Sequence, residues 1–163
     1  MKEQAFIGMD PGQEGTAYAL TFDSEIITSI RFERSTIVDI CNWYLDLSTV
    51  FACTTVLEEV HSMPRDGSAS AFKFGRGFGR LEGILAATKA RYIYATPQTW
   101  QKALRCLTGG DKKIAKSAAE RLWPEFSFSQ KTADGCLIAE YCRQRAMGLL
   151  VNQSAKKPAK MGK

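Results

Sequence analysis

Carboxylates end two short apolar runs of the sequence and open a third. Asp10 directly follows the run 5–9 and precedes a Pro-Gly turn, Glu58 and Glu59 end the run 54–57, and Asp134 precedes the apolar stretch 136–139. Carboxylates at two strand ends and one helix start can converge although they are far apart in the chain. Such a cluster repels itself unless a cation offsets its charge. Oxygen ligands without His or Cys favour Mg²⁺ or Mn²⁺, which promote phosphodiester hydrolysis.

Each of these carboxylates also has an ordinary structural interpretation. Asp-Pro-Gly is a common turn, and an Asp in the first turn of a helix suits the helix dipole. Because neighbouring strand residues point to opposite faces, Glu58 and Glu59 cannot both be surface residues for the same reason. The functional interpretation therefore requires a fold that brings all three positions together.

The elements that would position the carboxylates form an α/β pattern within one domain, residues 1–150. A helix capped by Ser35 is expected to begin near Ile37, and Thr96 is expected to cap a helix with Pro97 in its first position. Glycines 75, 77, 79 and 83 weaken the longest helix but permit close packing against another helix. We expect strands at 5–9, 15–22, 25–32, 54–57 and 92–94, and the remaining helices at 71–89, 112–123 and 132–147.

The charge of the chain is divided along its length. The 22 Lys and Arg exceed the 17 Asp and Glu, for a formal net charge of +5. Residues 1–64 hold 10 acidic and 3 basic residues, whereas residues 65–121 hold 12 basic and 4 acidic ones. One surface could hold cations while the other meets a polyanion, although a solvated basic face explains the bias equally well. The tail 151–163 is basic and is expected to be disordered, with a role as an electrostatic arm on nucleic acid left open.

Composition also excludes several classes of protein. No apolar run approaches the roughly 18 residues of a membrane span, and no secretory signal is expected at the N-terminus. The five cysteines are odd in number and form no C-x-x-C pair, and His61 is the only histidine. A disulfide framework and a multi-histidine metal site are therefore not expected. The cysteines instead predict a cytoplasmic protein with reduced thiols.

Together, the three acidic segments resemble the motifs of the RuvC family of Holliday junction resolvases, and most of all its small phage-encoded members. The likeness covers about residues 4–147. It rests on 6–12 (FIGMDPG), 57–60 (LEEV) and 133–139 (ADGCLIA), with 74–83 (FGRGFGRLEG), 95–100 (ATPQTW) and 109–113 (GGDKK) in the family's order. The resemblance implies a ribonuclease-H-like mixed five-stranded sheet flanked by helices, a homodimer, and divalent-metal cleavage of four-way DNA junctions. It also implies a cytoplasmic location, in a bacterial host cell if the protein is phage-encoded.

The same resemblance implies which residues act. Asp10, Glu58 and Asp134 match the metal ligands, with Mg²⁺ as the cofactor and Mn²⁺ as its substitute. The family usually has a second Asp or a His three residues before the last Asp, and here that residue is Lys131. Either Lys131 starts the last helix and contacts phosphate, which we favour, or it points to solvent and another carboxylate completes the metal set. Glu59 and Glu140 are the candidate substitutes, although Glu140 should lie off the helix face of Asp134.

Basic residues mark a DNA surface around these motifs. Arg65, Lys73, Arg76 and Arg80 flank the loop after Glu58 and alternate with phenylalanines 72, 74 and 78. These rings could wedge between bases or serve as core or dimer contacts. Phosphate contacts are also expected from Lys112, Lys113 and Lys116, which open a helix after two glycines, although solvated lysines are an equal alternative.

Other functions remain open at this stage. D-P-G-x-x-G-T at 10–16 also resembles the phosphate hairpin of actin-like ATPases, but the chain has no second hairpin and is too short, so no nucleotide cofactor is expected. A catalytically weak junction-binding module is a second alternative, because Lys131 breaks the acidic set. A ribonuclease-H-fold nuclease that prefers flaps or RNA–DNA hybrids is a third.

Overall fold

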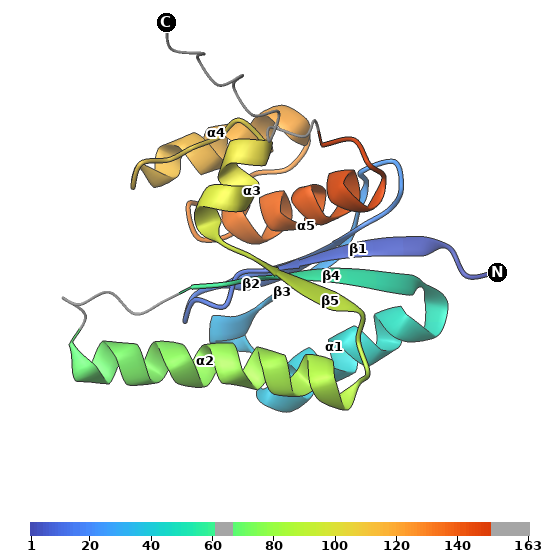
Figure 1. Ribbon diagram of the computed structural model, residues 1–163, viewed down its shortest axis with the longest axis horizontal. Helices are drawn as coiled ribbons and strands as arrows, with labels where there is room; N and C mark the ends of the chain where they lie inside the picture. Colours follow the sequence, from blue (N-terminus) through green and yellow to red (C-terminus); the bar gives the residue numbers. More distant parts are fainter. Residues whose placement is uncertain (61–66, 151–163) are drawn as a thin grey trace, which may run out of the picture.

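A five-stranded sheet lies between two layers of helices. The computed structural model describes residues 1–60 and 67–150. In Figure 1, α1 and α2 cover one face of the sheet, while α3, α4 and α5 lie over the other. The elements are β1 (Gln4–Met9), β2 (Thr16–Leu20), β3 (Ile26–Arg31), the short 3₁₀-helix η1 (Phe32–Arg34), α1 (Ile37–Val50), β4 (Ala52–Glu58), α2 (Ser68–Ala87), β5 (Tyr92–Ala95), α3 (Pro97–Ala103), α4 (Lys112–Leu122) and α5 (Ala133–Ala146).

The sheet is mixed, as the sequence predicted. Its strand order is β3-β2-β1-β4-β5. β1, β2 and β3 form an antiparallel meander, whereas β4 runs parallel to β1 and β5 runs parallel to β4. Met9 pairs with Leu57 in the register of β1 and β4, so the chain leaves both strands at the same edge of the sheet.

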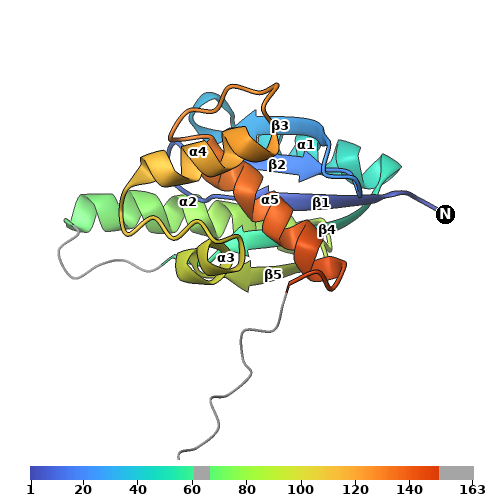
Figure 2. The same ribbon diagram turned by 90° about the horizontal axis from the view of Figure 1, so that it is seen from above.

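Helix α5 crosses the sheet at very close range. Figure 2 looks down on α5 as it passes over β1, β2 and β4. A Cβ atom at Gly8 would lie 2.0 Å from the backbone nitrogen of Ala139, and one at Gly135 would lie 2.3 Å from Oγ1 of Thr16. Only glycine at these two positions permits this separation, which brings the first turn of α5 down onto the ends of β1 and β2.

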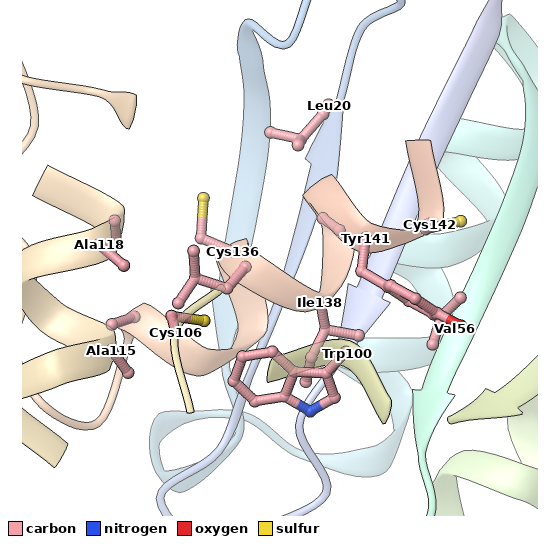
Figure 3. Packing of buried hydrophobic residues seen from close by; sticks show 14 of the residues in the cluster. Leu20, Val56, Trp100, Cys106, Ala115, Ala118, Cys136, Ile138, Tyr141 and Cys142 are labelled. Carbon is pink, nitrogen blue, oxygen red and sulfur yellow. The ribbon is translucent and has the colours of Figure 1, made fainter. Parts of the chain in front are cut away.

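Each face of the sheet has its own hydrophobic cluster. The cluster on the side of α3, α4 and α5 surrounds Trp100, which is fully buried together with Leu137 and Ile138; Figure 3 shows part of it. The cluster on the other face joins β1 and β2 to α1 and α2, with Tyr44 and Leu85 among its buried members. Within the described residues, no helix is long and apolar enough to cross a membrane.

The cap expected for α1 and the start expected for the last helix are both wrong, although α1 begins at Ile37 as expected. Thr36, not Ser35, caps α1: its Oγ1 accepts from the backbone nitrogen of Asp39, whose carboxylate accepts from the backbone nitrogen of Thr36. This reciprocal pair satisfies two free backbone groups, while the Ser35 hydroxyl donates to Arg31 O instead. The last helix begins at Ala133, so Lys131 lies in the preceding turn. The expected tail, 151–163, lies outside the described residues.

Candidate active site

Asp10 and Glu58 lie next to each other at the ends of two neighbouring parallel strands. Asp10 follows β1 and Glu58 is the last residue of β4, one position beyond the Met9–Leu57 pair. The Asp10 carboxylate accepts a hydrogen bond from the Gly12 backbone nitrogen at 3.0 Å, and its own backbone nitrogen donates to Thr16 O at 2.9 Å. The turn after β1 therefore fixes the carboxylate at the edge of the sheet.

The indole of Trp100 fixes the position of the Glu58 carboxylate. Its side chain is buried, with 7% of the residue exposed, and its Oε1 accepts a hydrogen bond of 2.8 Å from Trp100 Nε1. Trp100 is fully buried in α3, so its donor has a fixed position. Trp100 was not among the site residues expected from the sequence, although it lies within the ATPQTW stretch.

Asp134 completes the acidic group from the first turn of α5. It lines one pocket of about 470 Å³ together with Asp10 and Glu58, and Phe74 of α2 lines the same pocket. The three predicted carboxylates thus share one pocket. We refer to this space, at the ends of β1, β4 and the start of α5, as the acidic pocket.

Lys112 lines the acidic pocket and provides a partial counter-charge. It is the first residue of α4, and its Nζ lies 3.8 Å from Oδ2 of Asp134. Lys112 was expected at a DNA-binding helix start, not among the carboxylates. The 109–113 segment marks this lysine but does not indicate that it lies beside Asp134, because that depends on where the loop before α4 returns to the sheet.

The acidic pocket favours protonated carboxyl groups. Burial, then the charges of Asp10 and Asp134, raise the pKa of Glu58 to about 8, although the bond from Trp100 and the charge of Lys112 lower it. Burial and the charge of Asp10 raise the pKa of Asp134 to about 6. Burial also raises the pKa of Asp10 against the bond from Gly12 and the charge of Lys112. One ammonium group therefore does not neutralise the pocket.

The donor set fits a hard divalent cation. All three side chains offer carboxylate oxygens, which are the ligands that Mg²⁺ and Mn²⁺ prefer, and a bound cation would relieve the repulsion that raises their pKa values. Among residues 1–60 and 67–150, no three His, Cys, Asp or Glu side chains are close enough to form a complete metal-binding group. The carboxylates share the pocket without converging on a single point.

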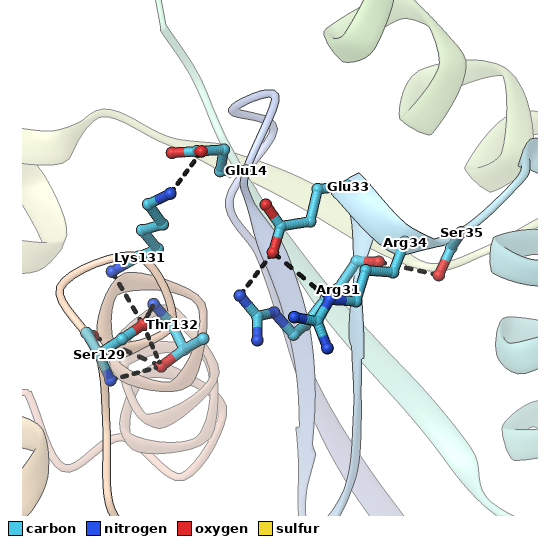
Figure 4. Close-up of polar contacts among 8 residues, drawn as sticks. All are labelled: Glu14, Arg31, Glu33, Arg34, Ser35, Ser129, Lys131 and Thr132. Carbon is cyan, nitrogen blue, oxygen red and sulfur yellow. Dashed lines mark hydrogen bonds and ion pairs between the residues drawn. The ribbon is translucent and has the colours of Figure 1, made fainter.

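Lys131 lies at the mouth of the acidic pocket. It lines the pocket with Glu14, and its Nζ forms an ion pair and hydrogen bond with the Glu14 carboxylate (Figure 4). Both side chains are about half exposed. Lys131 thus neither points away into solvent nor contacts Asp10 or Asp134, and its pairing with Glu14 had no signal in the sequence.

The two substitute carboxylates lie elsewhere. Glu59 does not line the acidic pocket, and its backbone nitrogen donates to Ala95 O. Glu140 is 2% exposed and accepts hydrogen bonds from Ser24, Arg143 and Gln144. Burial raises the pKa of Glu140, but these bonds outweigh it and leave the pKa below its ordinary value. Glu140 therefore fixes the β2–β3 turn to α5.

The predicted DNA-binding residues occupy different surroundings. Lys73, Arg76 and Arg80 of α2 line a cleft of about 440 Å³ that shares Gly12 and Gln13 with the acidic pocket. Lys113 is exposed beside Lys112, whereas Lys116 forms an ion pair with Glu120 at 3.3 Å. Arg65 lies outside the described residues. Of the phenylalanines, Phe72 is 71% exposed and Phe78 packs against Tyr94.

Solved structures share this fold. Thermus thermophilus RuvC in complex with a Holliday junction substrate superposes with a TM-score of 0.66 at 15% identity, over 89% of this chain and 96% of that one. A second structure of Thermus thermophilus RuvC gives the same TM-score and identity, and covers 97% of that chain. The yeast mitochondrial Holliday junction resolvase has a TM-score of 0.53 at 12% identity, over 89% of this chain and 82% of that one.

No protein-family model matches the sequence, and no curated protein matches it. At such low identities the structural likeness establishes the fold, and the predicted ribonuclease-H-like architecture is confirmed. The likeness to the small phage-encoded members of the family stays a prediction.

Proposed function

We propose that this protein is a structure-selective endonuclease that cleaves Holliday junctions and other branched DNA with the help of a divalent cation. The observation that carries the proposal is the acidic pocket, which Asp10, Glu58 and Asp134 line from three segments of a RuvC-like fold. The two flanking groups of cations, at the start of α4 and along α2, support a polyanionic substrate.

The proposed mechanism assigns a task to each residue of the pocket. Asp10, Glu58 and Asp134 would hold Mg²⁺, which supplies charge stabilisation for attack on a phosphodiester. Trp100 orients the Glu58 carboxylate, and the Gly12 backbone nitrogen orients that of Asp10. Lys112 and Lys131, whose ammonium groups lie at the pocket, would contact phosphate oxygens and offset developing charge.

We propose that the scissile strand enters along α2. The cleft lined by Lys73, Arg76 and Arg80 adjoins the acidic pocket through the turn at Gly12. Phosphates in this cleft would meet fixed positive charge before the strand reaches the carboxylates. Phe72, exposed at the start of α2, is the ring available to contact bases.

A homodimer is proposed on the outer face of α1 and α2. Glycines 75, 79 and 83 share one side of α2, and a Cβ atom at any of them would meet nothing within 4 Å. Ile37 and Val38 of α1 are 46% and 60% exposed beside this stripe, and line the same groove of about 640 Å³. A second copy packed here would form an isologous interface with one acidic pocket per protomer. Light scattering after size exclusion tests it, and a monomeric mass would contradict it.

We place the protein in the cytoplasm. All five cysteines are free thiols, and three of them are buried. Reduced cysteines are typical of proteins kept in a reducing compartment, and fractionation of the native host tests this location.

One cleavage experiment tests the function. A synthetic four-way junction, a flap, an RNA–DNA hybrid and a linear duplex are incubated at equal concentration with Mg²⁺. We expect the junction to be cut fastest. We expect Asp10→Asn, Glu58→Gln and Asp134→Asn to abolish cleavage while retaining junction binding in a gel-shift assay. Glu59→Gln, outside the pocket, is the matched control and should be milder.

The other outcomes have distinct meanings. Faster cleavage of flaps or hybrids would replace the junction with those substrates and keep the carboxylate mechanism. Junction binding without cleavage in Mg²⁺ or Mn²⁺ would make the chain a binding module. Wild-type turnover by any of the three pocket variants would remove that residue from the mechanism.

A further inference from the structure

A second cavity lies on the helical face away from α1 and α2. It occupies about 670 Å³ between α3, α4 and α5 and shares no lining residue with the acidic pocket. Its volume falls within the roughly 300–1,000 Å³ of typical ligand pockets. The floor is apolar, with buried Ala118, Leu137 and Tyr141 among its lining residues.

Two exposed leucines form part of the rim of this cavity. Leu122 at the end of α4 and Leu149 after α5 line the cavity and are 46% and 54% exposed. Neither side chain is needed for the core on this face, which Trp100 and its neighbours already fill. Exposed leucines gathered around a cavity indicate a contact surface more than scattered single residues do.

Cations from three helices surround the same cavity. Lys102 belongs to α3, Arg105 follows it, Arg121 belongs to α4 and Arg145 to α5; all four are exposed. Within the part of the chain that the structure describes, none of the four forms an ion pair, and the cavity lining contains no Asp or Glu. Four unpaired positive charges around an apolar floor complement a partner that is both anionic and apolar.

We propose that this cavity is a docking site for an acidic peptide segment of another protein, anchored by one bulky apolar side chain. The anchor would occupy the floor between Leu137 and Tyr141, while carboxylates of the peptide meet Arg121 and Arg145 at the rim. DNA fits less well, because a duplex presents phosphates and sugars to such a surface and has no side chain for an apolar floor. The protein's own residues 151–163 carry four lysines and no acid, so their charge has the wrong sign.

Peptide binding can be measured without nuclease activity. The probe is a fluorescein-labelled peptide of four aspartates followed by Leu-Phe, titrated with the full-length protein and followed by fluorescence anisotropy. A second probe ends in Gly-Gly, which keeps the charge and removes the anchor. We expect saturable binding of the first probe that weakens with salt, and at least about tenfold weaker binding of the second, since it has no bulky apolar side chain to bury on the floor of the cavity.

Charge reversal locates the binding to the cavity. The double variant Arg121→Glu/Arg145→Glu should weaken binding of the Leu-Phe probe by about tenfold or more, and junction cleavage should stay at the wild-type rate. The matched control is Arg91→Glu, an exposed arginine before β5 that does not line the cavity, and it should leave peptide binding unchanged.

Three results would overturn the proposal. The first is no binding of the Leu-Phe probe by the wild-type protein, and the second is equal loss in the double variant and the Arg91 control. The third is displacement of the probe by linear duplex DNA together with a matching loss of duplex affinity in the double variant, which would assign the surface to DNA.

Discussion

Replacing Glu58 by glutamine should stabilise the fold while it abolishes cleavage. Burial and the charges of Asp10 and Asp134 hold the pKa of Glu58 at about 8, against an ordinary value of 4.5. The folded state therefore keeps a proton that the unfolded chain releases at neutral pH. A glutamine cannot ionise, and its side-chain oxygen can still accept the bond from Trp100.

The size of the effect follows from linkage between proton binding and folding. A pH of 7 lies about 2.5 units above the pKa of 4.5 that Glu58 has in the unfolded chain. Each of these units costs the folded state about 1.4 kcal/mol, because the folded state keeps the proton that the unfolded chain releases. The largest gain is thus about 3 kcal/mol. Asp10 and Asp134 still repel each other in the variant, so we expect about 1–3 kcal/mol, or a rise in Tm of roughly 2–12 °C for a chain of this size.

The pH dependence has a definite sign. A carboxyl group with a raised pKa in the folded state contributes no penalty below pH 4.5, and its penalty grows as pH rises from there towards about 8. The free energy of unfolding of the wild-type protein should therefore fall over this range relative to the variant. The two proteins should be closest in stability near pH 4.5 and furthest apart near pH 8.

Thermal and urea denaturation in EDTA between pH 4.5 and 8.5 measure this difference. Glu59→Gln, at the adjacent position outside the acidic pocket, should follow the pH dependence of the wild-type protein. Added Mg²⁺ should raise the Tm of the wild-type protein more than that of Glu58→Gln, because the variant has one ligand charge fewer. A Glu58→Gln variant that is no more stable than wild type at pH 7–8 would refute the reasoning.

Three further predictions concern Lys131, Gly135 and the C-terminal tail. Lys131→Ala should slow cleavage, and Lys131→Asp should lower the Mg²⁺ concentration needed; full activity of Lys131→Ala at limiting and saturating Mg²⁺ would exclude a catalytic role. Gly135→Ala should lower the free energy of unfolding by about 1–3 kcal/mol, because its Cβ would lie 2.3 Å from Oγ1 of Thr16, and an unchanged urea midpoint would contradict the close packing of α5. Deleting residues 154–163 should weaken binding to all DNA shapes alike and reduce the slope of log affinity against log salt by about 0.9 for each phosphate that the tail neutralises, whereas an unchanged slope would mean that the tail does not bind DNA.

The sequence predicted which helices and strands form better than it predicted where they begin and end. The apolar runs that precede Asp10 and Glu58 became neighbouring parallel strands in the expected mixed sheet. The cap of α1 was misassigned although its start near Ile37 was correct, because Ser35 and Thr36 are both good caps and only Asp39, three residues after Thr36, decides between them. The glycines of α2 did not end that helix, since Leu81, Ile84 and Leu85 bury its inner side against the sheet.

The acidic members of the pocket were predictable, but its other members were not. Strand-end carboxylates carry a local signal in the sequence. By contrast, the bond from Trp100 to Glu58 joins residues 42 positions apart, and Lys112 reaches Asp134 through a loop whose path no periodicity encodes. Lys131 was expected on the helix face of Asp134, and the later start of α5 leaves it paired with Glu14 instead.

The contact between Gly8 and α5 makes one part of the acidic pocket more rigid than the rest. β1 and α5 meet backbone to backbone, so Asp10, two residues after Gly8, and Asp134, one residue before Gly135, are carried by what is effectively one rigid body. Ligand entry cannot increase the distance between the backbones of these two residues without separating the helix from the sheet. The pocket should therefore adjust through its side chains, among them Lys112, which is 60% exposed and lies 3.8 Å from Asp134. Exchange of the Lys112 ammonium for an incoming cation should therefore require side-chain rotation and no backbone motion.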